Sequence, residues 1–268
     1  MDNLILASVL SMTGLAIIFA AVLAFADKKL RVEEDPRVDK INHLLPGLNC
    51  GACGFLSCHD FAEHIVFENA DPGKCRVLDA ETREELFKLI GREGANLYPK
   101  IPVIHCAAGS ENKKIMADYK GIKTCLAADL IFGGGMQCEY GCMGLGDCVR
   151  ECPFDALTMK DGLPLVDQEK CTGCGKCEKA CPRNIIKIEE KKHKKLFYVA
   201  CSSHDNALRV RQVCGVGCIA CGICEKLSPE GFFKVTENLS YADYSKQDKQ
   251  EEVEILSMKC PTKVIKNM

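Results

Sequence analysis

The longest apolar stretch of the chain lies near its N-terminus. Residues 4–26 run for about 23 positions without a charged side chain, which is enough for a helix to span a bilayer. Asp2 precedes this stretch, and basic residues follow it at Lys28, Lys29 and Arg31. A secretory signal peptide would begin with basic residues and have a shorter apolar core, although residues 24–26 resemble a cleavage site. The pattern therefore predicts an uncleaved transmembrane anchor over residues 1–26.

The basic residues after the anchor also predict its orientation. Lysine and arginine next to a membrane helix favour the cytoplasmic side. We therefore expect a single pass through the cell (inner) membrane, with the N-terminus outside and everything after Lys28 in the cytoplasm. The cytoplasm is reducing, which suits free thiolates better than disulfides.

A charged stretch separates the anchor from the rest of the chain. Most side chains over residues 27–40 are charged, and Pro36 interrupts any helix that continues from the membrane. We interpret this stretch as a tether whose hinge is at Pro36.

The spacing of apolar residues in the next segment predicts a small helical module over residues 41–100. Phe61 and Ile65 lie about one helical turn apart, so they share one face of an expected helix. A second helix is expected over residues 80–90, with Asp79 as its N-cap. Together these two helices would close a small unit with its own core.

The remainder of the chain contains an internal repeat. The letters VIHC in the first copy correspond to YVAC in the second. Aligning Cys142 with Cys218 brings four further pairs into register: Cys138 with Cys214, Cys148 with Cys224, Leu145 with Cys221, and Cys152 with Ser228. Repeats of this kind indicate duplicated supersecondary units. We therefore expect an α+β fold with tandem lobes, each built from a duplicated strand–helix–strand (βαβ) unit.

Composition adds the chemistry to this picture. The chain has twenty cysteines among 268 residues, and its net charge of −2 gives no electrostatic argument for a nucleic acid partner. Disulfide frameworks belong to short secreted domains, and zinc sites use paired CxxC motifs. The run of Cys171, Cys174, Cys177 and Cys181, followed by proline, instead matches the bacterial ferredoxin spacing. It predicts iron–sulfur clusters and indicates that the expected lobes are ferredoxin-like.

The first repeat, residues 101–190, is expected to hold two clusters. In two-cluster ferredoxins, the fourth cysteine of each run ligates the other cluster. One cluster is therefore expected on Cys152, Cys171, Cys174 and Cys177, and the other on Cys142, Cys148 and Cys181. Leu145 occupies the usual position of the remaining ligand of the second cluster. Cys138 is the nearest substitute.

The second repeat, residues 191–268, is expected to hold one cluster. Its ligands are expected to be Cys218, Cys221, Cys224 and Cys260. Ser228 stands where a further cysteine would belong, and the stretch around Gln247 lacks the triplet for a second cluster. One complete ligand set is therefore expected here, and its partner set is absent.

The remaining cysteines form two further sets. The N-terminal module contains Cys50, Cys53, Cys58 and Cys75, for which a four-iron cluster suits the ferredoxin context better than zinc. The last set is Cys106, Cys125, Cys201 and Cys214. These four either hold a fifth cluster or serve as small buried apolar side chains. Four four-iron (4Fe-4S) clusters are therefore expected, or five if the last set is also used.

No other chemistry in the sequence competes with the clusters. Residues 133–135 are three glycines, but they lack the strand context of a dinucleotide-binding loop and are expected to end a helix. No Ser-His-Asp set or carboxylate pair presents itself along the sequence. Substrate chemistry on this chain is therefore not expected.

The order of these parts resembles the B subunit of the Rnf complexes, which are ion-translocating ferredoxin:NAD oxidoreductases. The resemblance rests on the single membrane helix, the motif NCGACGFLSC and the tandem ferredoxin motifs, and it covers nearly the whole chain. The segment QCEYGCMGLGDCVRECPFDAL resembles the longer form of the family. The chain departs from that form at Ser228 and around Gln247, so the cluster count of the family does not carry over.

The resemblance implies a membrane-tethered electron relay. Such a protein accepts electrons from reduced soluble ferredoxin and passes them to other membrane and peripheral subunits, which bind flavin and NAD and move Na⁺ or H⁺. It is an electron-transfer subunit of a translocase, without a complete active site of its own. Two alternatives remain: a membrane-anchored polyferredoxin that serves another reductase or hydrogenase, and a zinc-stabilised structural protein.

Overall fold

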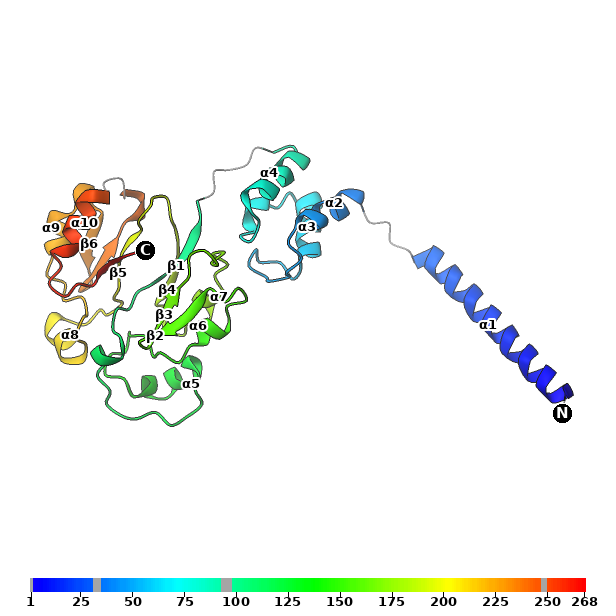
Figure 1. Cartoon of the computed structure of the whole chain (residues 1–268), viewed down its shortest axis with the longest axis horizontal. Helices are drawn as coiled ribbons and strands as arrows, with labels where there is room; N and C mark the ends of the chain where they lie inside the picture. The colour runs from blue at the N-terminus through cyan, green and yellow to red at the C-terminus, as the bar shows by residue number, and fades with distance from the viewer. Residues whose placement is uncertain (1, 31–34, 93–97, 247–249) are drawn as a thin grey trace.

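The computed structural model describes residues 2–30, 35–92, 98–246 and 250–268. Parts of the expected tether and module (31–34 and 93–97) and Gln247 therefore lie outside the described residues. Figure 1 shows an isolated helix at the N-terminus, a small helical module, and a larger part in which short helices and strands alternate.

Helix α1 (Asp2–Leu30) lies apart from the rest of the protein (Figure 1). Its segment Leu6–Lys29 is the one helix in the described part of the chain that is long and apolar enough to cross a membrane. None of the apolar window is buried within the protein. An exposed helix of this length and composition suits a lipid environment, in agreement with the expected anchor.

The helical module is built from three helices: α2 (Pro36–Leu44), α3 (Cys58–Phe67) and α4 (Ala80–Leu89). The two helices expected from the sequence are confirmed as α3 and α4. Asp79 caps α4, because its Oδ1 accepts a hydrogen bond of 2.8 Å from the Thr82 amide. Phe61 of α3 and Leu86 of α4 are buried in a common core.

Pro36 is the first residue of helix α2. Asp35 caps α2 through its side chain, and proline is well suited to the first turn, where its missing N–H is not needed. Val38 and Ile41 of α2 are buried against the module. Residues 36–40, which the sequence assigned to the tether, are therefore part of the module.

Within the described residues, the larger part contains four antiparallel strand pairs. They are β1 (Lys100–Ile104) with β4 (Ile186–Glu190), β2 (Leu157–Lys160) with β3 (Leu163–Val166), β5 (Phe197–Val199) with β8 (Ile265–Asn267), and β6 (Phe233–Thr236) with β7 (Leu239–Ala242). The outer pairs bring apolar residues together across the ladder: Ile104 lies opposite Ile186, and Val199 lies opposite Ile265.

Short helices separate these strands. They are α5 (Cys125–Leu130), α6 (Asp147–Arg150), α7 (Lys176–Lys179), α8 (Ala207–Val213), α9 (Ile223–Leu227) and α10 (Gln250–Met258). The larger part consists of two halves, the first from β1 to β4 and the second from β5 to β8. With α5 and α8 set aside, each half has the order strand, helix, strand, strand, helix, strand. The same hydrogen bond also recurs, from the Asp167 amide to Ala156 O at 2.8 Å and from the Asp243 amide to Phe232 O at 2.7 Å. The internal repeat of the sequence is therefore present in the order of elements.

The cores of the two halves differ in composition. The core of the first half includes Cys142, Cys148 and Cys177 beside Ile185 and Ile186. The core of the second half includes Phe232, Phe233, Val253 and Leu256. Aromatic and aliphatic side chains therefore fill much of the second half, whereas thiols line much of the first.

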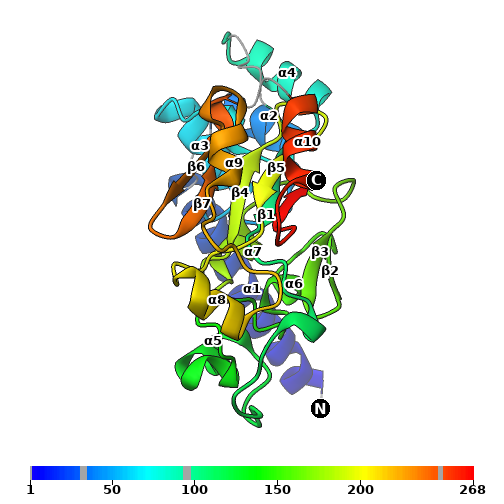
Figure 2. The same ribbon diagram turned by 90° about the vertical axis from the view of Figure 1, so that its left-hand side faces the viewer.

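His105 connects the two halves. Its Nδ1 lies 2.8 Å from Val199 O in β5, and Ser202 Oγ donates a hydrogen bond of 2.9 Å to His105 O. A separate β-bridge joins Lys113 to Cys214. Figures 1 and 2 show β5 beside the β1–β4 pair. The segment that follows β1 is therefore held against the second half.

Candidate cluster sites

The N-terminal cysteines gather at the start of α3. Cys58 begins this helix, and its amide donates a hydrogen bond of 2.8 Å to Asn49 Oδ1. Burial raises the pKa of Cys75, and the charges of Cys53 and Cys58 act in the same direction. Cys75 lies in the core of the module with Cys53 and Cys58 packed against that core, and Cys50 lies in the same loop as Cys53.

Four cysteines of the first half lie together in the combination that the ferredoxin spacing predicts. Burial raises the pKa of Cys177 to about 12, and the neighbouring thiols that act in the same direction include Cys174, Cys171 and Cys152. Gly173 between them has a φ of +66°, and a Cβ there would collide with the carbonyl of Lys100. Glycine is therefore needed for this loop to pack against β1.

A cavity in the first half is lined by Cys125 and not by Cys138. Its empty volume is about 380 Å³, and its thiols are Cys125, Cys142, Cys148 and Cys181. Burial raises the pKa of Cys148 to about 12, and the charges of Cys142 and Cys125 add to this effect. Cys138, the substitute favoured by sequence spacing, lines a different cavity.

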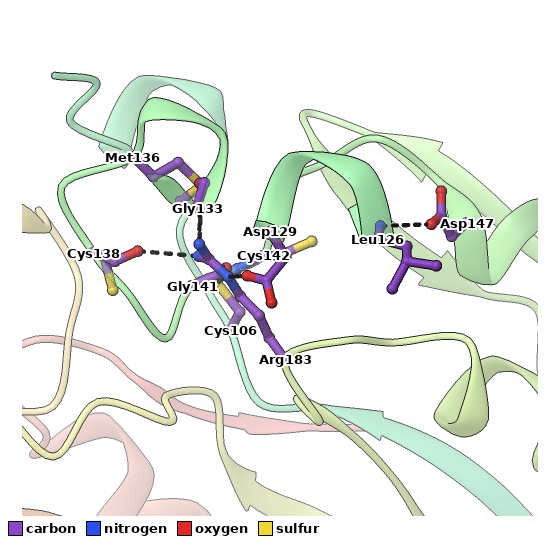
Figure 3. A network of polar contacts seen from close by, with 10 residues as sticks. All are labelled: Cys106, Leu126, Asp129, Gly133, Met136, Cys138, Gly141, Cys142, Asp147 and Arg183. Carbon is purple, nitrogen blue, oxygen red and sulfur yellow. Dashed lines mark hydrogen bonds and ion pairs between the residues drawn. The ribbon is translucent and has the colours of Figure 1, made fainter. Parts of the chain in front are cut away.

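Helix α5 holds Cys125 at this cavity. The Thr124 side chain accepts a hydrogen bond of 3.2 Å from the Ala127 amide, and Asp147 Oδ2 accepts one of 3.1 Å from the Leu126 amide (Figure 3). These bonds satisfy amides at the start of the helix. A capping threonine directly before a cysteine is a signal that sequence reasoning could have used. The separation of Cys125 from the later motif concealed its place at this cavity.

Cys138 lines a cavity between the two halves. The cavity has an empty volume of about 480 Å³, and its other thiols are Cys106, Cys201 and Cys214. Of the four thiols, the first half supplies Cys106 and Cys138, and the second half supplies Cys201 and Cys214. The internal repeat relates Cys106 to Cys201 and Cys138 to Cys214. Burial raises the pKa of Cys201 to about 12. Three cysteines of the last set therefore meet in this cavity, and Cys138 takes the place of Cys125 as its fourth thiol.

The cysteine triplet of the second half lies with its later partner. Cys218, Cys221, Cys224 and Cys260 line a cavity with an empty volume of about 410 Å³. Ser240 Oγ is 3.2 Å from the Cys224 sulfur. The structure thus brings together the four residues that the sequence assigned to this site.

Ser228 has a structural contact in place of a ligand role. Its Oγ accepts a hydrogen bond of 2.7 Å from the Phe233 amide. Phe232 and Phe233 have no exposed surface and pack in the core beside this position. The position that corresponds to Cys152 of the first half therefore bonds to the backbone of a buried apolar segment.

The cysteine groups suit a cluster better than a single metal ion. Thiolates on zinc converge to about 2.3 Å from the metal. Among the residues that the structure describes, no three His, Cys, Asp or Glu side chains converge closely enough to hold one ion. Three separate cavities are instead each lined by four thiols. Four thiolates around a shared space meet the ligand requirement of a four-iron cluster.

Two family models match parts of the chain. Residues 45–77 match the model described as "Putative Fe-S cluster", which includes the four N-terminal cysteines. Residues 164–187 match the "4Fe-4S binding domain", which includes the run from Cys171 to Cys181. Both matches agree with iron–sulfur chemistry at these positions.

Curated relatives resemble nearly the whole chain. The B subunit of the proton-translocating ferredoxin:NAD(+) oxidoreductase complex of Clostridium ljungdahlii is 39% identical over 98% of this chain and 93% of its own length. In Methanosarcina acetivorans, the B subunit of an ion-translocating oxidoreductase complex is 36% identical over 92% of this chain and 93% of its own length. The corresponding B subunit of the Na(+)-translocating complex of Acetobacterium woodii is 36% identical over 92% of this chain and 74% of its own length. The chain belongs to the family of B subunits of ion-translocating ferredoxin:NAD oxidoreductase (Rnf) complexes.

Proposed function

We propose that the chain is the membrane-anchored electron relay of an ion-translocating ferredoxin:NAD oxidoreductase, with five four-iron clusters. The observation that carries this proposal is the division of the twenty cysteines into five groups of four. Three groups line separate cavities, and the other two follow the N-terminal and ferredoxin motifs. No cysteine is left over.

The proposed ligand sets follow these groups. They are Cys50, Cys53, Cys58 and Cys75; Cys152, Cys171, Cys174 and Cys177; Cys125, Cys142, Cys148 and Cys181; Cys106, Cys138, Cys201 and Cys214; and Cys218, Cys221, Cys224 and Cys260. Two sets interlock in the first half, and the second half has one set of its own. This pattern suits tandem ferredoxin-like lobes over residues 101–190 and 191–268.

The residues around each site hold the iron, donate hydrogen bonds to sulfur and exclude water. A bound cluster supplies the one-electron chemistry. The cysteines hold the iron, and backbone amides donate to sulfur, as the Cys142 amide does to Cys106 Sγ and the Cys218 amide does to Cys201 Sγ. Such bonds tune the reduction potential. The apolar walls, such as Ile185 and Ile186 beside the Cys125 cavity, exclude water from the sulfur atoms.

The proposed electron donor is reduced soluble ferredoxin, and the proposed acceptors are proteins of the complex that bind flavin and NAD. The names of two relatives include ferredoxin and NAD(+) as substrates of their complexes. Large apolar side chains between Ile115 and Phe132 support contact with other subunits, since Leu130 is 81% and Phe132 is 86% exposed.

The proposed location is the cell membrane. We propose that α1 crosses the bilayer once, with the N-terminus outside and the cysteine groups in the cytoplasm. Lys28 and Lys29 in the last turn of α1 support this orientation. A protease added to sealed inside-out vesicles should then cleave the cysteine-rich part, and protection of that part would contradict the orientation.

Metal analysis of the anaerobically purified protein tests the proposal. Five four-iron clusters require about twenty irons and twenty sulfides per chain, and four clusters require about sixteen of each. A colourless protein with a few zinc ions would overturn it. Co-purification with flavin- and NAD-binding membrane subunits separates this function from that of a polyferredoxin that serves another reductase or hydrogenase.

A further inference from the structure

Arg183 is a buried guanidinium that the cluster motifs do not explain. It lies two positions after Cys181, and its side chain is only 5% exposed. Its Nε donates a hydrogen bond of 2.8 Å to Asp129 Oδ1 on α5 (Figure 3). A buried charge is costly unless it is paired and its donors are satisfied, so the other guanidinium contacts decide what Arg183 does.

The remaining donors of Arg183 reach three backbone carbonyls. Nη2 donates to Gly133 O at 3.0 Å, and Nη1 donates to Cys138 O at 3.1 Å and to Gly141 O at 2.7 Å (Figure 3). One side chain thus binds the glycine turn after α5 and both ends of the segment from Cys138 to Gly141.

The glycine turn is shaped to receive this guanidinium. Gly133 and Gly134 have φ values of +58° and +67°, and they follow Phe132, two residues after the end of α5. A Cβ on Gly133 would collide with Nη2 of Arg183. The turn therefore does more than end a helix, because its first glycine leaves the space that the side chain fills.

The segment bound by Arg183 connects two of the proposed cluster sites. Cys138 lines the cavity between the halves, whereas Cys142 lines the cavity that contains Cys125. Arg183 itself is part of the wall of the second cavity. Movement of this short segment would shift one ligand of each site at the same time.

We propose that Arg183 is a positioning residue that fixes these two cluster sites relative to each other by clamping the segment between Cys138 and Cys142. The planar guanidinium suits this task because its donors point in several fixed directions at once. A lysine ammonium is a compact point charge on a flexible stem, so it would keep the charge and lose the clamp. The inference rests on the proposed function, since it requires clusters at both sites.

The test compares three variants of the full chain in its purified complex. Arg183→Lys keeps the charge, Arg183→Gln removes it, and Arg209→Gln is the matched control. Arg209 lies on the surface hollow that also includes Arg183, and it is exposed. Iron content, cluster EPR spectra and backbone hydrogen exchange are measured for each.

We expect both Arg183 variants to raise amide hydrogen exchange over residues 134–142 by about tenfold or more, because local opening becomes easier. The EPR signals of the two adjacent clusters should change, while those of the other three stay as in the parent protein. Cys125→Ala and Cys138→Ala identify the two signals. Arg209→Gln should leave exchange and spectra unchanged.

Three results would overturn the inference. Unchanged exchange and spectra in Arg183→Gln would show that no clamp exists. Full recovery in Arg183→Lys would assign the role to charge alone, and equal loss of all five clusters in both variants would indicate a general folding requirement. If the parent protein lacks iron at either site, the proposed function fails instead, and the exchange measurement still reports on the clamp.

Discussion

The backbone amide of Cys142 donates a hydrogen bond of 3.4 Å to the sulfur of Cys106. Cys142 lines one cavity of the first half, and Cys106 lines the cavity between the halves. The same relationship recurs between Cys218 and Cys201, at 3.3 Å. Because the internal repeat reproduces the contact, the cavity between the halves has its neighbours arranged alike on both sides. This symmetry supports the proposed cluster site over the alternative of small buried apolar side chains.

The assignment of Cys125 and Cys138 to two different clusters can be tested by asking whether the iron losses of the two single variants add. Cys125→Ala and Cys138→Ala should each remove about four irons, since each breaks a different ligand set of four. The double variant should then lose about eight irons per chain. Iron and sulfide analysis under anaerobic conditions measures this. A double variant that loses no more iron than one single variant would place both cysteines on the same cluster.

A cysteine at position 228 should not restore a further cluster. The Ser228→Cys variant should keep the iron content of the parent protein, because Phe232 and Phe233 fill the space beside this position. Ser228→Ala, its control, should lower the free energy of unfolding by about 1 kcal/mol, through loss of the bond from the Phe233 amide. A gain of about four irons in Ser228→Cys would contradict this account of the apolar core.

Crowding at Gly173 should make its substitution more harmful than that of a comparable glycine. Gly173 and Gly222 both have left-handed φ values, +66° and +72°, and both lie between cysteines of a cluster motif. A Cβ at Gly173 would collide with Lys100 O, whereas a Cβ at Gly222 would meet nothing within 4 Å. Gly222→Ala should cost about 1–2 kcal/mol from backbone strain alone. Gly173→Ala should cost more, with a lower thermal midpoint. Equal midpoints would show that the loop does not need its close approach to β1.

Removal of α1 should release the protein from the membrane without emptying its cluster sites. None of the apolar window in Leu6–Lys29 is buried, so its loss exposes no core. A chain that begins at residue 35 should remain in the soluble fraction with the iron content of the full chain. Sedimentation with membranes and iron analysis measure both properties. Loss of iron from this variant would mean that the anchor contributes to the cluster-binding part.

Helices α3 and α4 of the N-terminal module could be predicted from local pattern, and so could part of their packing. Asp79 supplied a capping side chain, and the periodicity of Phe61 and Ile65 indicated a buried helix face; both features depend on residues close in sequence. Pro36 was ambiguous, because proline both interrupts a helix and begins one. The buried contacts of Val38 and Ile41 resolve it as a helix start.

The sequence by itself determined the cysteine runs and their chemistry. Spacing within Cys171, Cys174 and Cys177 is local, so the chain has little freedom to direct these thiols elsewhere. The ferredoxin pattern also placed Cys152, Cys181 and Cys260, but tertiary structure decided the grouping of the cysteines outside that pattern. Cys125 and Cys138 are both candidates along the chain, and only the packing of α5 brings the first to Cys142 and Cys148. Cys138 meets Cys201 and Cys214 because contacts such as that of His105 with β5 hold the two halves together. For cysteines outside the motifs, residue spacing does not encode which thiols meet, because their grouping depends on how distant segments pack.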